Sequence, residues 1–208
     1  MPPLARVRGS TKVVLLVLLA VVALLALVGI GQYNGLVGAQ EQVKGAWSQI
    51  DNQYKRRADL IPNLVETVKG AADFEKSTLQ AVTEARAAVA KVQLPAELPT
   101  DPDKLAAYLQ AQQQLGGALS RLFAVAENYP QLRATESFKS LQDQLEGTEN
   151  RVAVARKDYI DAARTFNTKV RSFPANLFAS MFGFAPVAQF EAEAADRTPP
   201  KVEFGQRK

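Results

Sequence analysis

The side chains available for chemistry in this 208-residue chain are limited, because it contains neither histidine nor cysteine. Catalysis by a Ser-His-Asp triad or a Cys-His pair is therefore excluded within one chain. Disulfides are excluded too, as are zinc, haem and iron–sulfur sites that depend on histidine or cysteine ligands. Carboxylates, lysine, tyrosine, serine and threonine remain. The enzyme chemistry that they would best support is hydrolysis by paired carboxylates.

Several polar residues fall on or beside positions that otherwise carry apolar side chains. Arg57, Glu75 and Thr148 occupy such positions, where a charged residue must be paired or must serve a function. The candidate polar network consists of Asp51, Arg57, Asp59, Asn63, Glu149 and Arg156. Nothing in their spacing brings two carboxylates together in a cleft. We therefore predict a structural network that fixes the register of helices, without enzyme activity, metal or cofactor.

The element that carries most of these residues is a series of helical heptads that begins near Trp47. Apolar residues recur every three or four positions through Ile50 and onward to Val92, which is typical of a helix with one buried face. Pro62 interrupts the series, because proline removes a backbone hydrogen bond and disfavours helical geometry in the residue before it. Either one long helix kinked at Pro62 or two helices with a tight turn near Asp59–Ile61 fits this pattern.

Two further helices are predicted after a proline-containing loop at Leu94–Pro102. The first begins after a cap at Thr100 or Asp101 and ends before Asn128-Tyr129-Pro130. The second runs from about Gln131 to Ser172. Alternating β-branched stretches are almost absent, so the predicted fold class is all-α. The sequence indicates an N-terminal transmembrane helix followed by an up-and-down bundle of long helices, of the four-helix-bundle type.

A charge-free apolar segment, Val13–Ile30, precedes the bundle. As a helix it spans roughly 27 Å, close to the ~30 Å hydrocarbon core of a bilayer. It is longer than the apolar part of a usual signal peptide and no Ala-x-Ala site follows it, which favours an uncleaved anchor over a cleaved signal. Arg6, Arg8 and Lys12 precede it. By the positive-inside rule, the N-terminus is expected in the cytoplasm and the bundle outside a bacterial cytoplasmic membrane.

The chain is accordingly divided into four parts. We expect a basic cytoplasmic tail at 1–12, a transmembrane anchor at 13–31, a helical bundle at 32–173, and an apolar segment with a polar tail at 174–208. After the tail and anchor the chain is nearly neutral, with 22 basic and 21 acidic side chains. No nucleic-acid partner is therefore expected.

The apolar segment near the C-terminus is a candidate interaction segment. It includes Leu177, Phe178, Met181, Phe182 and Phe184. The segment is too short and too interrupted to span a bilayer. It either packs against the end of the bundle or binds a membrane interface or a protein partner.

Several sequence blocks resemble the LemA family of bacterial membrane-anchored proteins. They read Tyr33-Asn34-x-Leu36-Val37, Ala46-Trp47-Ser48-Gln49-Ile50-Asp51, Lys55-Arg56-Arg57-Ala58-Asp59-Leu60-Ile61-Pro62-Asn63-Leu64-Val65, Glu127-Asn128-Tyr129-Pro130, Thr148-Glu149-Asn150-Arg151 and Ala155-Arg156-x-x-Tyr159. The resemblance implies an up-and-down four-helix bundle behind one membrane helix, with no established enzymatic activity. The family includes a magnetosome-membrane protein, and other members are encoded beside membrane metalloproteases of the HtpX type. Membrane organisation or a partnership with quality control is what the resemblance implies.

These observations together predict a membrane-anchored, non-enzymatic helical scaffold of the bacterial cell envelope. The long heptads favour self-association into a homo-oligomer. Gly31, Gly35 and Gly38, at the end of the anchor, would allow either close helix approach or a flexible joint. Lipid is the expected partner of the anchor. The alternative is an adaptor or regulator of a membrane quality-control protease, and a carboxylate-based envelope hydrolase is the least favoured function.

Overall fold

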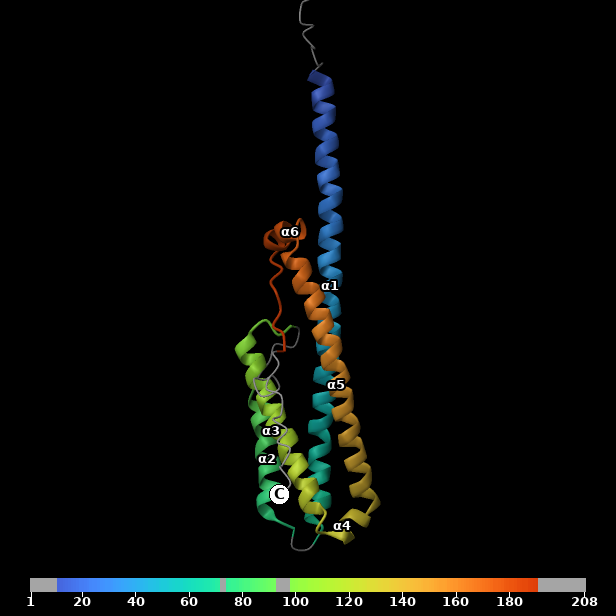
Figure 1. The fold of residues 1–208 in the computed structure, drawn as a ribbon, viewed down its shortest axis with the longest axis vertical. Coiled ribbons are helices and arrows are strands. Elements are labelled where there is room, and N and C mark those ends of the chain that lie inside the picture. Colours follow the sequence, from blue (N-terminus) through green and yellow to red (C-terminus); the bar gives the residue numbers. More distant parts are fainter. Residues whose placement is uncertain (1–10, 72–73, 93–97, 191–208) are drawn as a thin grey trace, which may run out of the picture.

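The computed structural model describes residues 11–71, 74–92 and 98–190. Within these ranges it contains helices and no strand, and the helices are α1 Thr11–Lys69, α2 Lys76–Lys91, α3 Pro102–Ala126, α4 Pro130–Ala134, α5 Glu136–Arg171 and α6 Ala175–Phe182. The four long helices alternate in direction along the chain, with α2 and α3 on one side and α1 and α5 on the other (Figure 1). The predicted all-α bundle is confirmed.

Helix α1 is one continuous helix of 59 residues that passes through Pro62. The alternative of a turn near Asp59–Ile61 is therefore wrong. Ile61 and Leu64, on either side of the proline, are 1% and 0% exposed. Their packing in the bundle core offsets the backbone hydrogen bond that proline removes. The chain instead leaves the helix at Gly70, a residue of low helix propensity.

The first part of α1 projects beyond the bundle (Figure 1). Every large apolar side chain from Val13 to Ile30 is between 41% and 69% exposed. In the described part of the chain, α1 is the one helix long and apolar enough to cross a membrane. The first fully buried residue of α1 is Leu36.

The starts of α3 and α5 are fixed by side-chain caps. Asp101, one of the two predicted caps, caps α3. Its carboxylate accepts hydrogen bonds from the backbone amides of Asp103 and Lys104 at 3.0 and 3.2 Å. The predicted uninterrupted helix from Gln131 to Ser172 is wrong at its start, because the short α4 precedes α5. The Thr135 hydroxyl donates to the Leu132 carbonyl at 2.7 Å and accepts from the Phe138 amide at 3.4 Å. This one side chain therefore ends α4 and caps α5.

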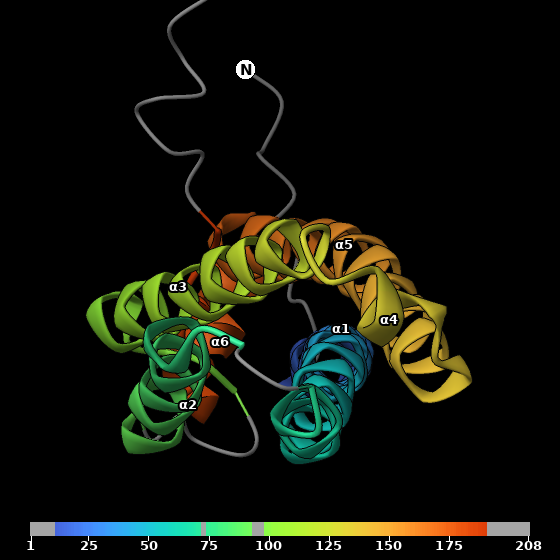
Figure 2. The ribbon, with the colours of Figure 1, turned by 90° about the horizontal axis from the view of Figure 1, so that it is seen from below.

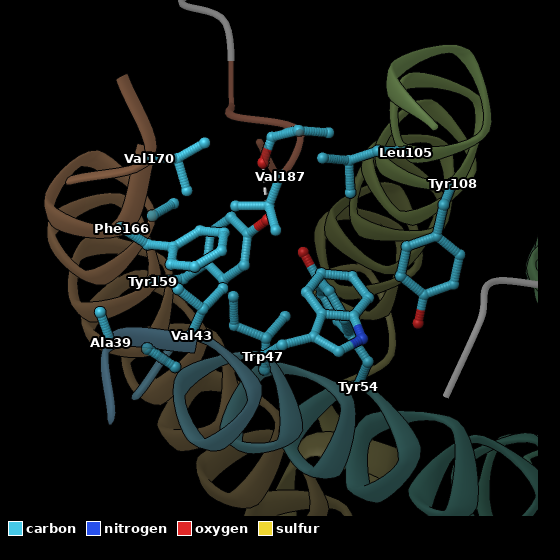
Figure 3. Packing of buried hydrophobic residues seen from close by; sticks show 14 of the residues in the cluster. Ala39, Val43, Trp47, Tyr54, Leu105, Tyr108, Tyr159, Phe166, Val170 and Val187 are labelled. Atoms are coloured by element: carbon cyan, nitrogen blue, oxygen red, sulfur yellow. Dashed lines mark hydrogen bonds between the residues drawn. The ribbon is translucent and has the colours of Figure 1, made fainter. Parts of the chain in front are cut away.

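The core of the bundle is aromatic in the half nearer the exposed apolar part of α1. Trp47 of α1 is 2% exposed. Its ring lies edge-on to Tyr159 of α5 at 5.7 Å and to Tyr108 of α3 at 6.4 Å between centroids. Figure 3 shows these rings converging from three helices. The half of the core farther from the anchor is mainly aliphatic, and includes Ile61, Leu64, Val68, Val82, Leu115, Leu119, Leu122, Leu141 and Leu145.

Residues 184–190 lie without regular structure along α5 and are held there by buried hydrogen bonds. Asn167 donates to the Val187 carbonyl and accepts from the Val187 amide, both at 2.9 Å. The Tyr159 hydroxyl donates to the Ala188 carbonyl at 2.6 Å. These bonds satisfy backbone groups that would otherwise be buried without partners. The segment after α6 is therefore part of the folded bundle.

Candidate functional site: the cleft between the helix pairs

A cleft of about 1010 Å³ lies between the two pairs of long helices. Backbone contacts are concentrated within the pairs, α1 with α5 and α2 with α3, and the view from below in Figure 2 shows α1 and α2 apart from each other, with α3 and α5 above them in the view. The volume is at the upper end of the range for small-molecule sites. Its polar lining includes Arg57 of α1, Gln112 of α3, and Glu149 and Arg156 of α5.

Arg57 is the buried charge of the cleft. Its side chain is 6% exposed and pairs with the Glu149 carboxylate, which is 57% exposed. Burial lowers the pKa of Arg57, but a guanidinium remains charged at neutral pH. Gly116 of α3 faces the guanidinium, since an added Cβ there would make an ordinary contact at 3.9 Å with Nη2 of Arg57.

Arg156 forms the polar wall of the cleft on the side of the aromatic half of the core. Its Nε and Nη2 donate to the Tyr54 hydroxyl at 3.0 and 2.5 Å. Its guanidinium carbon lies 5.8 Å from the centroids of both the Tyr54 and the Phe190 rings. Cation–π attraction and the hydrogen bonds therefore hold Arg156 in one orientation, between α1 and the segment after α6.

Gln112 carries the unsatisfied polar atom of the cleft. The residue is 2% exposed, and within the described residues its Oε1 has no hydrogen-bond partner. Its side chain hydrogen-bonds to Tyr108. Burial raises the pKa of Tyr108 to about 12, while the bond from Gln112 opposes that shift. A buried acceptor without a partner typically costs about 1–3 kcal/mol, so this atom lowers the stability of the packed helices beside the cleft.

The carboxylates of the cleft do not form a hydrolytic pair. Glu146 and Glu149 line it from the same helix, three residues apart, so both project from one wall. Glycoside hydrolysis by two carboxylates needs them on opposite sides of the bond that is cut. Glu149 is paired with Arg57, and Glu146 accepts a hydrogen bond from Gln142 at 2.9 Å. The arrangement therefore suits binding rather than acid–base catalysis.

Comparison with known proteins decides the family. The sequence matches the LemA family over residues 46–204, well over half of the chain. The chain belongs to the LemA family. Magnetosome proteins MamQ 1 and MamQ 2 of Paramagnetospirillum magneticum are each 27% identical to it, over 92% of this chain and 76% of their own length. Protein LemA of Metamycoplasma hominis is 26% identical, over 81% of this chain and 73% of its own.

In this LemA-family bundle the six residues of the predicted polar network do not all meet. Arg57, Glu149 and Arg156 line the cleft. Asp51 pairs with Lys55 at 2.6 Å, within α1, and Asp59 and Asn63 are exposed. A helix turns about 100° per residue. Positions two and six residues after Arg57 therefore face well away from the cleft.

Two other polar residues that occupy predicted apolar positions form hydrogen bonds with residues three positions away in the sequence. The Thr148 hydroxyl donates to the Leu145 carbonyl at 2.7 Å, inside α5. Glu75 lies exposed just before α2 and accepts from the Thr78 hydroxyl at 3.1 Å. Both residues therefore support helix geometry and contribute nothing to the cleft.

The candidate interaction segment forms α6 and the turn after it, and it has two sides. Leu177, Met181 and Phe182 are 58%, 71% and 52% exposed. Phe178 and Phe184 are partly buried against the rest of the protein. The segment therefore both packs on the bundle and presents apolar side chains outward.

Sequence reasoning missed two polar residues that organise the structure. Gln112 lies four positions after Tyr108 and three before Leu115, both buried. Its helical spacing from these apolar residues could therefore have predicted that it is buried. Asn167 directly follows the seam residue Phe166. Nothing local in the sequence indicates that its amide would bind the backbone of Val187, twenty residues later.

Proposed function

We propose that this LemA-family protein is a membrane-anchored, non-enzymatic scaffold of the bacterial cell envelope that self-associates and organises membrane or partner proteins. Family membership and the MamQ relatives support a membrane-associated protein of non-enzymatic kind. The exposed apolar part of α1 supports its attachment to lipid. The MamQ relatives are magnetosome proteins, which is consistent with a role in organising a membrane.

The observation that carries self-association is a row of glycines on the open side of α1. Gly31, Gly38 and Gly45 follow one another at heptad spacing, and a Cβ added at any of them would meet no atom within 4 Å. Gly35 differs, because its added Cβ would lie 3.1 Å from Nζ of Lys169. Glycines in a row let two helix backbones approach closely, and an anchor keeps copies concentrated in one plane. A second α1 is the partner that this surface fits.

The test is the mass of the full-length protein in detergent, measured by light scattering over a wide concentration range. We expect more than one chain per particle, and Gly38→Leu should shift the mass toward the monomer. Gly117→Leu is the matched control, since Gly117 is also helical with open space around its Cβ position, but on α3. A wild-type monomer throughout, or equal behaviour of the two variants, would count against association through this face.

The proposed topology places the N-terminus in the cytoplasm, with the bundle on the outer side of the cytoplasmic membrane. The three basic residues that precede the anchor support it. Protease added to intact spheroplasts should digest the bundle. Digestion that occurs only after lysis would reverse the topology.

The cleft favours a second candidate function, an adaptor or regulator of a membrane quality-control protease. The feature in favour is a space of about 1010 Å³ that is lined by the charged side chains of Arg57, Glu149 and Arg156. An adaptor would co-purify with a protease of the same membrane, and Gly117→Leu, which narrows the cleft, should weaken that association. A scaffold alone would purify as its own oligomer, unaffected by this variant.

A further inference from the structure

Helix α6 lies at the end of the bundle nearest the anchor (Figure 1) and carries apolar side chains that the protein leaves uncovered. Leu177 and Met181 lie one helical turn apart on α6 and are 58% and 71% exposed, Phe182 beside them is 52% exposed, and Phe173 in the turn before the helix is 81% exposed. No charged residue occurs from Phe173 to Phe190. Such a patch on a protein marks a surface that something apolar covers.

The opposite side of α6 is fixed to α1. Ala175 and Ala179 are 4% and 1% exposed. The helix ends at Gly183, whose φ of +75° suits glycine. The Phe184 amide then returns to the Ala179 carbonyl at 2.9 Å. The outward direction of the apolar patch is therefore set by the fold.

The depth of α6 relative to the anchor follows from two contacts. The ring of Phe178 lies against Gly29, where an added Cβ would be 3.0 Å from Cε1. Tyr33 stacks edge-on against Phe182 at 4.9 Å and Phe184 at 5.8 Å. Gly29 belongs to the last turn of the apolar segment, and its whole span of roughly 27 Å matches the hydrocarbon core. Helix α6 therefore lies at the level where the anchor leaves the hydrocarbon.

Basic side chains lie immediately beside the patch. Lys169 and Arg171 are in the last turn of α5, before Phe173. Lys169 donates to the Gly35 carbonyl at 2.8 Å and so joins α5 to α1 just beyond the anchor. Interfacial segments combine apolar side chains in the acyl boundary with nearby cations at the headgroups.

We propose that α6 lies in the headgroup region of the membrane that α1 crosses, with Phe173, Leu177, Met181 and Phe182 in contact with lipid. This inference rests on the proposed anchor. It adds a second membrane contact, which fixes the tilt of the bundle, because a rigid body held by one helix alone can swing about it. The glycine row and the cleft are then held at set heights and directions above the bilayer.

The test uses site-directed spin labels in the full-length protein, because a chain without cysteine accepts a single labelled cysteine. Met181→Cys and Leu177→Cys are reconstituted in vesicles of phosphatidylcholine and phosphatidylglycerol. Collision with oxygen, which partitions into lipid, is compared with collision with a water-soluble nickel complex. Val154→Cys is the matched control, an apolar residue of α5 that is 61% exposed, and Leu19→Cys reports the anchor, where the wild-type residue is 62% exposed.

We expect the oxygen-to-nickel ratio at the α6 labels to be several-fold above that at residue 154, approaching that at residue 19. If the oxygen-to-nickel ratio at the α6 labels equals that at residue 154 while residue 19 lies in lipid, this inference is overturned but the proposed anchor stands. Spin–spin broadening at residue 181 with loss of both collisions also overturns it, because a second copy then covers the patch. A water-like ratio at residue 19 shows that the anchor itself fails.

Discussion

The Arg57–Glu149 pair gives the sharpest prediction about the cleft, because its two members differ in burial. Arg57 is 6% exposed and Glu149 is 57% exposed. Removing the carboxylate leaves a buried cation without its partner, whereas removing the cation leaves a carboxylate that water can solvate. We therefore expect Glu149→Gln to destabilise the bundle and Arg57→Met, which keeps the length of the side chain, to be close to neutral.

The difference in burial between Arg57 and Glu149 sets the expected loss of stability. Breaking a fully buried pair by removing one partner costs about 3–5 kcal/mol. Solvent reaches more than half of Glu149 and screens the pair, so we expect about 1–2 kcal/mol for Glu149→Gln. In a chain of this size, 1 kcal/mol corresponds to a shift of roughly 2–4 °C in Tm. The predicted decrease is about 2–8 °C, against less than about 1 °C for Arg57→Met.

The assay is thermal unfolding of full-length protein in detergent, followed by the fluorescence of Trp47. This is the single tryptophan of the chain and lies in the bundle core, so its signal reports the bundle and not the anchor. The double variant should be more stable than Glu149→Gln alone, because no buried charge then remains. Equal losses from Arg57→Met and Glu149→Gln, or no loss from Glu149→Gln, would refute this reasoning.

Three further predictions concern the core and its attachments. Trp47→Ala should lower the free energy of unfolding by about 3–5 kcal/mol, and an unchanged melting curve by circular dichroism would show that Trp47 is not a packing residue. Asn167→Ala removes both bonds to Val187 and should cost about 1–3 kcal/mol while increasing proteolysis within residues 184–190; wild-type resistance would contradict this. Burial raises the pKa of Tyr108 from 10.0 to about 12, so the folded state keeps a proton that the unfolded state has lost. This contribution to stability is complete below about pH 10 and falls as pH rises toward 12. The difference in phenolate absorbance between the wild type and Tyr108→Phe should therefore show Tyr108 ionising well above pH 10, and a difference curve centred near pH 10 would refute it.

Much of the fold could be predicted because it depends on periodicity. The buried positions Trp47, Leu115 and Phe166 all follow from apolar spacing, and so does the all-α class. The end of α1 could not be placed, because Pro62 is a strong local signal against a helix and the packing that outweighs it is tertiary. Thr135 was not predicted as a cap, because its role depends on two hydrogen bonds of its hydroxyl, to the Leu132 carbonyl and from the Phe138 amide.

The candidate site was less predictable than the fold. Heptad spacing placed Arg57 in a seam, but it could not say that Glu149, 92 positions later, is its partner. Asp59 and Asn63 were grouped with them by proximity in sequence, although helical rotation turns them away from the cleft. The open glycines of α1 and the direction of α6 depend on which helices pack against which faces. Only the three-dimensional structure contains that information.

Self-association in the membrane is the central claim, and co-recovery of two differently tagged full-length copies tests it most directly. Both copies are expressed in one cell, the membranes are solubilised, and one tag is used for capture. Membranes that carry each copy separately, mixed before solubilisation, control for exchange in detergent. We expect recovery of the second tag from the co-expressing cells and not from the mixture, with a reduced yield for Gly38→Leu. Capture of the first tag alone, from cells that contain both copies in equal amounts, would contradict it.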